Sequence, residues 1–461
     1  MKACMRLAPA LLPLLLAACG EPVPQGPSLL VITLDTTRAD VLGCYGSPLG
    51  ATPRLDRLAG ESVQLERAYA PMPQTLPSHA TLFTGLSPRR HGAVENARVL
   101  DPDVETLAGD LARRGWDTAA CIGALVLEQG TGIERGFAHF DQPQGVARDS
   151  QHPVERRAAA VTDAALWWAG RRADPSRPYL LWVHYYDPHG PYEPAQERVP
   201  LAAVRAEVER RERAAPGELS GAELPEIARL WHGYVNEVAE VDAQVGRLLD
   251  GLRERGLLER TAVLVVGDHG EGLMEHGEKG HGATIHEELM RVPVLLSAPG
   301  VAPARAAGAL ELQDLLATAY EAAGLGTPPA GAEGRSRWPE IRGSRPWTPQ
   351  PLVVERPFYL PGGERALRAD AHDYGFGLLA AVVLGDEKLL REPDGRERLF
   401  DLAADPAELV DLAERRPQSR ARLAALLDQW LKDHPPPGDG AEVSDERREV
   451  LRQLGYVEEG R

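Results

Sequence analysis

Three stretches of the chain are almost continuously apolar, and each ends in polar residues. They are residues 28–35 (SLLVITLD), 179–187 (YLLWVHYYD) and 261–270 (TAVLVVGDHG). Short apolar runs without alternation are typical of strands whose two faces are both buried, as in a parallel sheet covered by helices. The pattern therefore predicts a buried sheet built from these strands.

Residues 234–256 carry a different periodicity. Apolar side chains recur there at steps of three and four residues: Val235, Val238, Val241, Val245 and Leu248. This spacing predicts an amphipathic helix that packs one face on the sheet. Strands that alternate with helices predict an α/β fold, with a mainly parallel sheet sandwiched by helices.

Polar residues gather at the carboxyl ends of the three predicted strands. Asp35 ends the first, His184 and Asp187 lie at the end of the second, and Asp268 and His269 follow the third. In open α/β sheets, ligands bind at this edge. We therefore expect the functional site there.

The last part of the chain changes character after residue 325. Residues 326–351 are rich in Gly, Pro and Arg, which predicts a linker. From residue 352, short strand-like runs precede a helical pattern, which predicts a small α+β C-terminal subdomain over residues 352–461. Residues 28–325 then form the catalytic domain.

The N-terminal residues are predicted to be a targeting segment. Lys2 and Arg6 precede an apolar run that is shorter than the roughly 20 residues a membrane helix needs. Leu16-Ala17-Ala18-Cys19 resembles the lipobox of bacterial lipoproteins. We expect residues 1–18 to be removed, Cys19 to carry lipid, and residues 19–27 to be a tether. The alternative is a plain signal peptide with a chance Cys19.

This N-terminus implies export to the cell envelope, with the protein lipid-anchored to a bacterial membrane and facing the periplasm or the exterior. Two further cysteines, Cys44 and Cys121, could pair in an oxidising compartment or remain free, and the sequence leaves both options open.

The charge of the chain excludes one class of partner. The formal net charge is −17 at pH 7 and no basic run occurs, so we expect no nucleic-acid binding. An anionic substrate would need local cations in so acidic a protein, such as a metal, His, Lys or Arg.

Several stretches together resemble the sulfatase-type members of the alkaline phosphatase superfamily. They are VITLDTTRADVLGCYG, TLPSHATLFTGLSPRRHG, WVHYYDPHGPYEP, VVGDHGEGLMEHGEKGHG, HEELMRVPVLLSAPG, RLFDLAADPAELVDLAE and LRQLGYV, in the family's order. The resemblance covers nearly all of the chain after residue 28. It implies a metal-dependent hydrolase or transferase of sulfate or phosphate esters.

The resemblance implies one divalent metal, which Asp35, Thr75, Asp268 and His269 would bind. Thr36 stands where many relatives carry a second Asp, and His269 stands where many carry Asn. The imidazole shifts the expected preference towards Mn or Zn, with Ca and Mg as the other candidates. A second metal would need Asp187, His189 and His281.

Thr75 aligns with the nucleophile of the family, which in sulfatases is a Cys or Ser oxidised to formylglycine. Threonine is not a known substrate of that modification, and His79 replaces the Arg of the signature. Thr75 is therefore expected to attack through its own hydroxyl, which favours phosphate over sulfate esters. The alternative role for Thr75, or for Ser78, is to cap the following helix.

Further residues are assigned by the same resemblance. His79, His189 and His281 are expected to be catalytic beside Thr75. The predicted substrate-binding residues are Asn96, His184 and Lys279. Asn96 could instead cap a loop, His184 could order its neighbours or support the metal, and Lys279 could replace His281 at the anion. His276 and His286 flank this group without an assigned role.

The predicted substrate is an anionic ester of a glycan, a lipid or a small molecule. The alternative function is a catalytically inactive sulfatase-like protein of the envelope that binds glycans. Five of the expected site residues are retained, namely Asp35, Asp268, His269, His189 and His281, and this favours the enzyme.

Overall fold

The computed structural model describes most of the chain. The described residues are 26–143, 156–172, 174, 176–356, 377–438, 443–444, 447–449 and 451. The expected signal segment, the lipidated Cys19 and most of the tether lie outside them, so these remain predictions.

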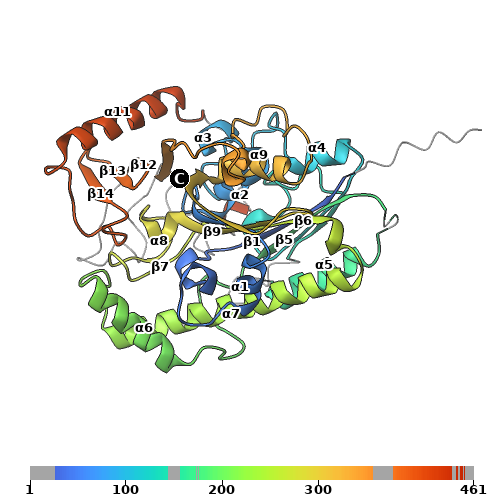
Figure 1. Cartoon of the computed structure of the whole chain (residues 1–461), viewed down its shortest axis with the longest axis horizontal. Helices are drawn as coiled ribbons and strands as arrows, with labels where there is room; N and C mark the ends of the chain where they lie inside the picture. Colours follow the sequence, from blue (N-terminus) through green and yellow to red (C-terminus); the bar gives the residue numbers. More distant parts are fainter. Residues whose placement is uncertain are drawn as a thin grey trace, which may run out of the picture.

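An eight-stranded sheet forms the centre of the molecule (Figure 1). Its strands lie in the order β10 (Ala304–Glu311), β2 (Val63–Tyr69), β9 (Arg291–Ser297), β6 (Thr261–Gly267), β1 (Ser28–Leu34), β5 (Tyr179–Tyr185), β3 (Asp117–Ile122) and β4 (His139–Asp141). Strand β9 runs antiparallel to both of its neighbours, and the other pairs are parallel. The predicted mainly parallel sheet is confirmed.

The continuous apolar runs follow from burial on both faces of this sheet. Along β1, Leu29 and Val31 belong to one hydrophobic cluster, while Leu30 and Ile32 belong to another on the opposite face. Successive side chains of a strand point to opposite faces. A strand covered on both sides therefore carries mainly apolar side chains until it reaches the edge of the sheet.

Helices cover both faces of the sheet (Figure 1). One face packs on α1 (Pro53–Ala59), α5 (Ala158–Ala169) and α7 (Leu224–Glu254). The other packs on α2 (Thr75–Thr84), α4 (Leu107–Arg113) and α9 (Leu312–Ala322), with α3 (Pro88–His91) next to α2. The helix predicted from residue 234 lies within α7, whose apolar stripe begins further upstream at Ile227.

Shorter elements complete the catalytic part. They are α6 (Leu201–Ala214), β7 (Gly272–Leu273), β8 (Lys279–Gly280), α8 (Glu287–Met290), α10 (Trp338–Ile341), and 3-10 turns at Ala39–Val41, Gly43–Tyr45, Leu125–Leu127 and Leu258–Arg260. Helix α10 lies in the region predicted as a linker.

A second, antiparallel sheet forms the C-terminal subdomain. It contains β11 (Leu352–Arg356), β12 (Leu379–Leu384), β13 (Glu387–Arg391) and β14 (Glu397–Asp401), in this order. One face packs on α11 (Pro417–Asp433), and the other joins the main hydrophobic core through residues such as Val354 and Phe400. The predicted α+β subdomain is therefore docked on the catalytic part.

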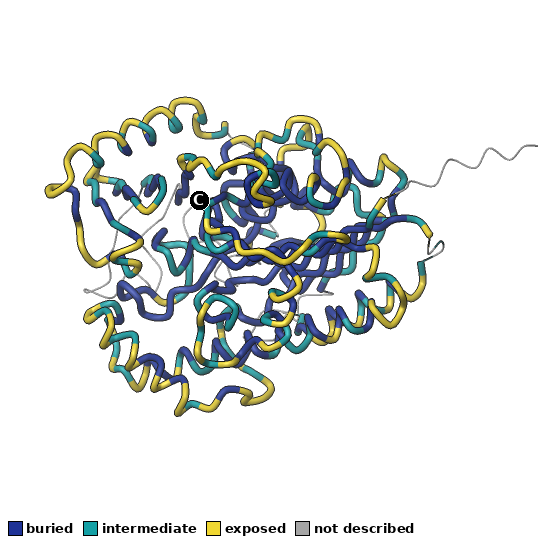
Figure 2. Tube along the Cα trace, in the orientation of Figure 1, coloured by how far each residue is buried: buried dark blue, intermediate teal, exposed yellow. Residues whose placement is uncertain are grey.

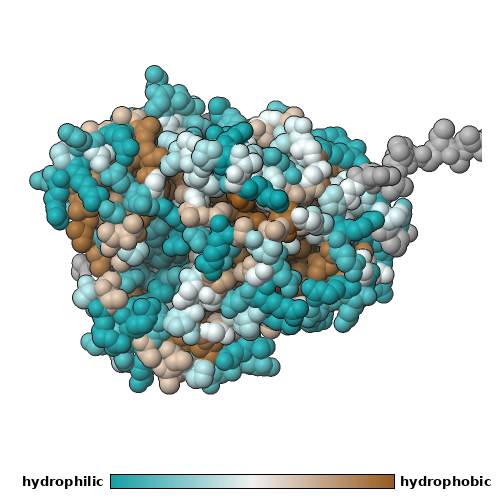
Figure 3. Space-filling view, viewed as in Figure 1, coloured by the Kyte–Doolittle hydropathy of each residue, from teal (hydrophilic) through white to brown (hydrophobic). Residues whose placement is uncertain are grey.

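Burial follows this layering. The inner strands of the central sheet are mostly buried and its edge strands β10 and β4 are not, whereas α6 and α11 expose one side to solvent (Figure 2). The face shown in Figure 3 is mostly hydrophilic, with hydrophobic atoms in separate small areas. Among the described residues, no helix has the length and apolar character that crossing a membrane requires. Cys44 and Cys121 are both free, and this settles the option that the sequence left open.

Candidate active site

Three neighbouring strands bring the predicted site residues together. In the central sheet β1 lies between β6 and β5, with Leu34 opposite both Gly267 and Tyr185. Asp35 and Asp268 follow these strand ends, and the backbone amide of Asp268 still donates to the carbonyl of Leu34, at 3.3 Å. The order of the strands, and not proximity in the sequence, therefore places the two carboxylates side by side.

These carboxylates are buried and largely unsatisfied. Asp35 Oδ1 and Oδ2 and Asp268 Oδ2 are enclosed by protein and accept no hydrogen bond. Burial raises the pKa of Asp35 to about 7, and burial together with the Asp35 charge raises the pKa of Asp268 to about 8. Among the described residues, neither forms an ion pair with Lys or Arg.

A divalent cation fits this arrangement. Ligand atoms of Asp35, Asp268 and His269 all lie within 4.8 Å of one another. Carboxylate oxygens with one imidazole are a suitable donor set for a hard or borderline divalent ion. A bound cation would also compensate the buried negative charge. We call these three residues the carboxylate site.

The backbone at Thr36 supports the same interpretation. Its φ of 45° places a β-branched residue in the left-handed region, a conformation such residues rarely adopt. The Thr36 amide donates to Asp268 Oδ1 at 3.1 Å, and the amide of His269 donates to the same oxygen at 2.8 Å. The strained turn thus fixes one oxygen of Asp268. Strain of this kind is concentrated at functional sites.

Thr75 is the first residue of helix α2, next to the carboxylate site. Its Oγ1 lies 3.4 Å from Nε2 of His269. His269 Nδ1 donates to the carbonyl of Gly270 at 2.9 Å, so Nε2 carries the lone pair that faces Thr75. The N-terminus of a ten-residue helix also favours a bound anion.

Asn96 caps this helix. Its Oδ1 accepts from the amide of Leu76 at 3.0 Å, whereas Gln74 at the N-cap position makes no such bond and Ser78 Oγ donates to the carbonyl of Met72. Asn96 thus caps the N-terminus of α2 and not a loop, and neither Thr75 nor Ser78 acts as the cap. The Nδ2 donors of Asn96, which an oxyanion would need, are not used in this bond.

His79 and His184 lie behind the carboxylates. His79 Nδ1 donates to the carbonyl of Thr75 at 2.8 Å and is 3.7 Å from Asp268 Oδ2. Burial lowers the pKa of His79 to about 3. The ring is therefore neutral and its Nε2 is an acceptor, so it supplies neither the positive charge of an Arg nor a proton near neutral pH.

His184 lies on the other side of Asp35. Its Nε2 is 3.3 Å from Asp35 Oδ2, and its Nδ1 is 2.9 Å from the hydroxyl of Thr33, which also accepts from Trp182 Nε1. Burial lowers the pKa of His184 to about 4. The geometry matches a residue that orders or supports the carboxylate site more closely than one that binds substrate.

His281 and His189 lie on the far side of His269. The His281 ring centroid is 4.5 Å from that of His269 and 5.0 Å from that of His189. His281 Nδ1 is 3.1 Å from Glu271 Oε1, and burial lowers the pKa of His189 to about 3. Lys279, the alternative to His281, is exposed on β8.

Glu271 was missed at the sequence level. It follows Asp268 by three residues in the same GDHGEG turn, and this nearness was the available signal. Only the fold shows that its carboxylate contacts His281.

A second metal, which the sequence left open and for which Asp187, His189 and His281 were the candidate ligands, has no ligand group at these residues. Asp187 Oδ1 instead lies 3.5 Å from Arg157 Nε, and the three residues form no ligand group among those described. A different group is present at His276, His286 and Glu288.

Comparisons with known proteins agree with this geometry. The chain is 25% identical over 460 residues to an arylsulfatase of Clostridium perfringens, covering 84% of this chain and 90% of the relative. It is 24% identical to a choline-sulfatase of Rhizobium meliloti, covering 87% and 86%. The fold is similar to that of the phosphonate monoester hydrolase of Agrobacterium radiobacter, with a TM-score of 0.69, 22% identity, and 88% and 96% coverage.

The family itself is shown by a longer match. A profile of the sulfatase family matches residues 27–325, which is more than half of the chain. Members of this family use a divalent metal, and the carboxylate site offers ligands for one. This protein therefore belongs to the sulfatase family and is an ester hydrolase of the sulfatase superfamily.

Proposed function

We propose that the protein hydrolyses phosphate esters, or transfers their phosphoryl group, with unmodified Thr75 as the nucleophile; sulfate esters are the less favoured substrates. One observation carries the proposal: the Thr75 hydroxyl lies at a helix N-terminus, 3.4 Å from His269, and beside three buried carboxylate oxygens of the carboxylate site that accept no hydrogen bond. This is a site for a nucleophile, an anion and a cation together.

Asp35, Asp268 and His269 would hold one divalent metal, with Thr75 beside it. A bound divalent ion lowers the pKa of a neighbouring hydroxyl and neutralises charge on the ester oxygens. Of Mn, Zn, Ca and Mg, we favour Mn or Zn because one ligand is an imidazole. His184 and Thr36 hold the two aspartates in place.

Thr75 then bonds to phosphorus, after its hydroxyl proton has passed to water, and the bond to the leaving alcohol breaks. The leaving oxygen takes a proton from His281, and Glu271 Oε1, at 3.1 Å from His281 Nδ1, keeps the ring oriented. His189, which is neutral, contacts the leaving group as an acceptor. Water finally cleaves the phospho-threonine, one of its protons returning to His281.

Phosphate is favoured because threonine has a single hydroxyl. A phospho-threonine is released by in-line attack of water, whereas a sulfo-threonine is harder to cleave. Formylglycine avoids that step with its second hydroxyl, but Thr75 and His79 replace both signature residues of that modification.

The test is an assay of the purified chain with 4-nitrophenyl phosphate, bis(4-nitrophenyl) phosphate and 4-nitrophenyl sulfate, each with Mn, Zn, Mg or Ca. We expect turnover of a phosphate ester, about 10²-fold or greater loss in Thr75→Ala, and retained activity in the control Thr75→Ser. Mass spectrometry of the quenched reaction should find a phosphoryl group on Thr75. Equal turnover by wild type and Thr75→Ala contradicts the proposal.

The substrate class we favour is an anionic sugar ester. Relatives with printed names include an N-acetylglucosamine-6-O-sulfatase and a hexuronate-2-O-sulfatase of Bacteroides thetaiotaomicron, which are 24% identical to this chain. Lipid and small-molecule esters are the other outcomes of a substrate screen.

We also propose that the protein is exported and lipid-anchored through Cys19. The support is the charged and apolar N-terminus followed by Leu16-Ala17-Ala18-Cys19. In bacterial cells, wild type should incorporate labelled palmitate and sediment with membranes. Cys19→Ala should do neither, and equal labelling of the two proteins would contradict the anchor.

A further inference from the structure

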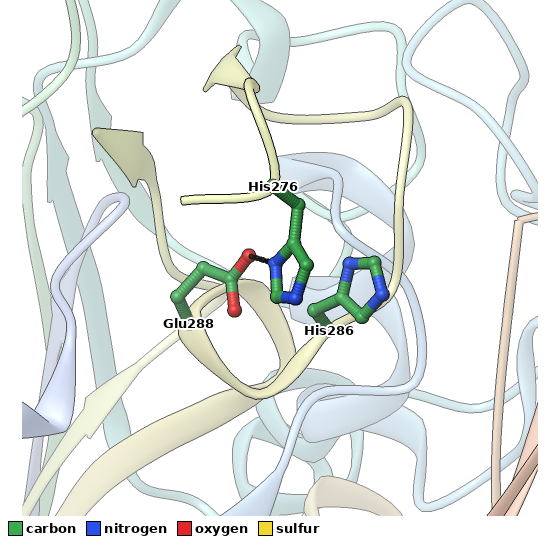
Figure 4. A group of neighbouring side chains, drawn as sticks. All are labelled: His276, His286 and Glu288. Atoms are coloured by element: carbon green, nitrogen blue, oxygen red, sulfur yellow. Dashed lines mark hydrogen bonds and ion pairs between the residues drawn. The ribbon is translucent and has the colours of Figure 1, made fainter. Parts of the chain in front are cut away.

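A loop beside the active site has a potential ligand group at its ends. Residues 276–286, the His281 loop, begin at His276 and end at His286, immediately before α8. Figure 4 shows the two imidazoles side by side, with the carboxylate of Glu288 next to them. The ring centroids are 3.7 Å apart, and His276 Nδ1 lies 3.1 Å from Glu288 Oε1.

The three side chains form a compact, buried donor set. Their ligand atoms all lie within 4.8 Å of one another, and His276 and His286 are only 7% and 1% exposed. Two imidazoles and one carboxylate are typical zinc ligands, at about 2.0–2.2 Å from the ion. Ligand atoms bound to one ion are then about 3–3.5 Å apart. His276 Nδ1 and Glu288 Oε1 are at such a distance, 3.1 Å, as a hydrogen bond that a bound ion would replace.

One rearrangement is required. The rings are parallel to within 13°, whereas a metal lies in the plane of each imidazole that binds it. A rotation of the His286 ring about its side-chain bonds would direct one nitrogen of each imidazole towards the carboxylate of Glu288. The change is confined to side chains.

The surroundings favour a cation at this position. The carboxylates of Glu288, Glu408 and Glu275 create a negative electrostatic field at His276, and this field attracts a metal ion. Lys388 compensates part of this charge through its ion pair with Glu408 at 2.9 Å.

We propose that His276, His286 and Glu288 form a second transition-metal site, suited to Zn²⁺ and separate from the carboxylate site. The ion would fasten both ends of the His281 loop to α8. The three side chains leave the fourth tetrahedral position to water, and the site does not depend on Thr75 being the nucleophile.

The position of α8 links this site to the active site. A Cβ atom at Gly270 would lie 1.8 Å from the carbonyl oxygen of Glu288, and the Gly270 amide donates to the carbonyl of Leu289 at 2.7 Å. The turn that carries His269 therefore packs directly on the backbone of α8. An ion bound to Glu288 would thus restrain His281 from one side and support His269 from the other.

The test is Zn²⁺ binding to the metal-free full chain by calorimetry, with the bound metal counted by elemental analysis. Asp35→Asn removes a ligand of the carboxylate site. His286→Phe is the matched variant of the second site, since phenylalanine keeps a ring against His276 but has no donor nitrogen.

We expect two Zn²⁺ per chain in wild type and one in each single variant. In the double variant, any remaining Zn²⁺ binding should be at least tenfold weaker than the binding in either single variant. X-ray absorption of Zn-loaded Asp35→Asn should show two imidazole ligands, and this readout does not depend on the folding of His286→Phe. Loss of all zinc in Asp35→Asn, or unchanged binding in the double variant, overturns the proposal.

Discussion

Two groups of buried carboxylates in this protein differ in the partners that compensate their negative charge. At the carboxylate site, Asp35 and Asp268 have oxygens without hydrogen bonds and no Lys or Arg partner among the described residues. Where the C-terminal subdomain docks on α8, Lys388 Nζ lies 3.3 Å from Glu287 and 2.9 Å from Glu408. We call these last three residues the junction cluster.

This difference distinguishes a candidate functional site from a structural contact between the two parts of the chain. In the junction cluster, Tyr69 donates to Glu287 Oε2 at 3.0 Å and the Glu287 amide donates to Glu408 Oε2 at 2.7 Å, so these donors and Lys388 compensate part of the negative charge within the chain. The carboxylate site has no such internal compensation. An uncompensated buried charge costs stability, and chains retain it where a ligand supplies the missing partner.

The largest expected effect is that of Asp268→Asn. Activity should fall by about 10²-fold or more, since a metal ligand is lost while Oδ1 can still accept from Thr36 and His269. The metal-free variant should nevertheless be more stable than metal-free wild type at pH 8, by about 2 kcal/mol, because a buried charge is removed. Enzyme assays and chemical denaturation measure the two effects. If metal-free Asp268→Asn is less stable than metal-free wild type, the predicted difference between the carboxylate site and the junction cluster is wrong.

Lys388→Met should have the opposite effect on stability. It leaves Glu287 and Glu408 buried without a cation, and we expect about 3–5 kcal/mol of destabilisation in guanidinium unfolding. The double variant Lys388→Met/Glu408→Gln is the matched control, and it should recover part of this loss. Additive effects of the two substitutions would show that the pair is not coupled.

Asn96→Ala tests a neutral residue beside the carboxylate site. The substitution removes the bond from the Leu76 amide and should cost about 1–2 kcal/mol of stability. Because α2 positions Thr75, kcat should fall more than KM rises. Asn96→Asp, which keeps the acceptor, should restore the stability but not the activity, since it lacks the Nδ2 donors. Unchanged stability in Asn96→Ala would exclude the capping role.

Asp242 on α7 is intermediate between the carboxylate site and the junction cluster. Its carboxylate is stabilised by backbone amides and not by a Lys side chain or a metal. Its carboxylate accepts from Arg54 and Leu55 at the start of α1, yet burial raises its pKa from 3.8 to about 6. A raised pKa contributes stability that is complete below pH 3.8 and is lost as the pH rises through 6.

Asp242→Asn should remove this dependence, since Oδ1 can still accept both amides. The variant should gain about 1 kcal/mol on wild type between pH 4 and pH 7, measured by thermal unfolding. A difference that stays constant with pH would show that the amides fully compensate the charge.

The sequence by itself determined the layered fold and the edge of the sheet at which the site lies. The apolar runs at residues 28–34 and 261–267 require strands buried on both faces, so the first charged residues after them, Asp35 and Asp268, had to emerge at the edge. This information is local, since burial on both faces leaves a continuous signal in each run.

The tertiary structure decided which histidines lie together, that Asn96 caps α2, and that Cys44 and Cys121 are free. The His-Gly pairs at residues 269–270, 276–277 and 281–282 look alike in the sequence, yet His281 lies against His269 while His276 stacks on His286. That division depends on the packing of α8 against Gly270, which brings together residues that the sequence separates. Side-chain direction in such loops is set by distant partners, and no local pattern encodes them.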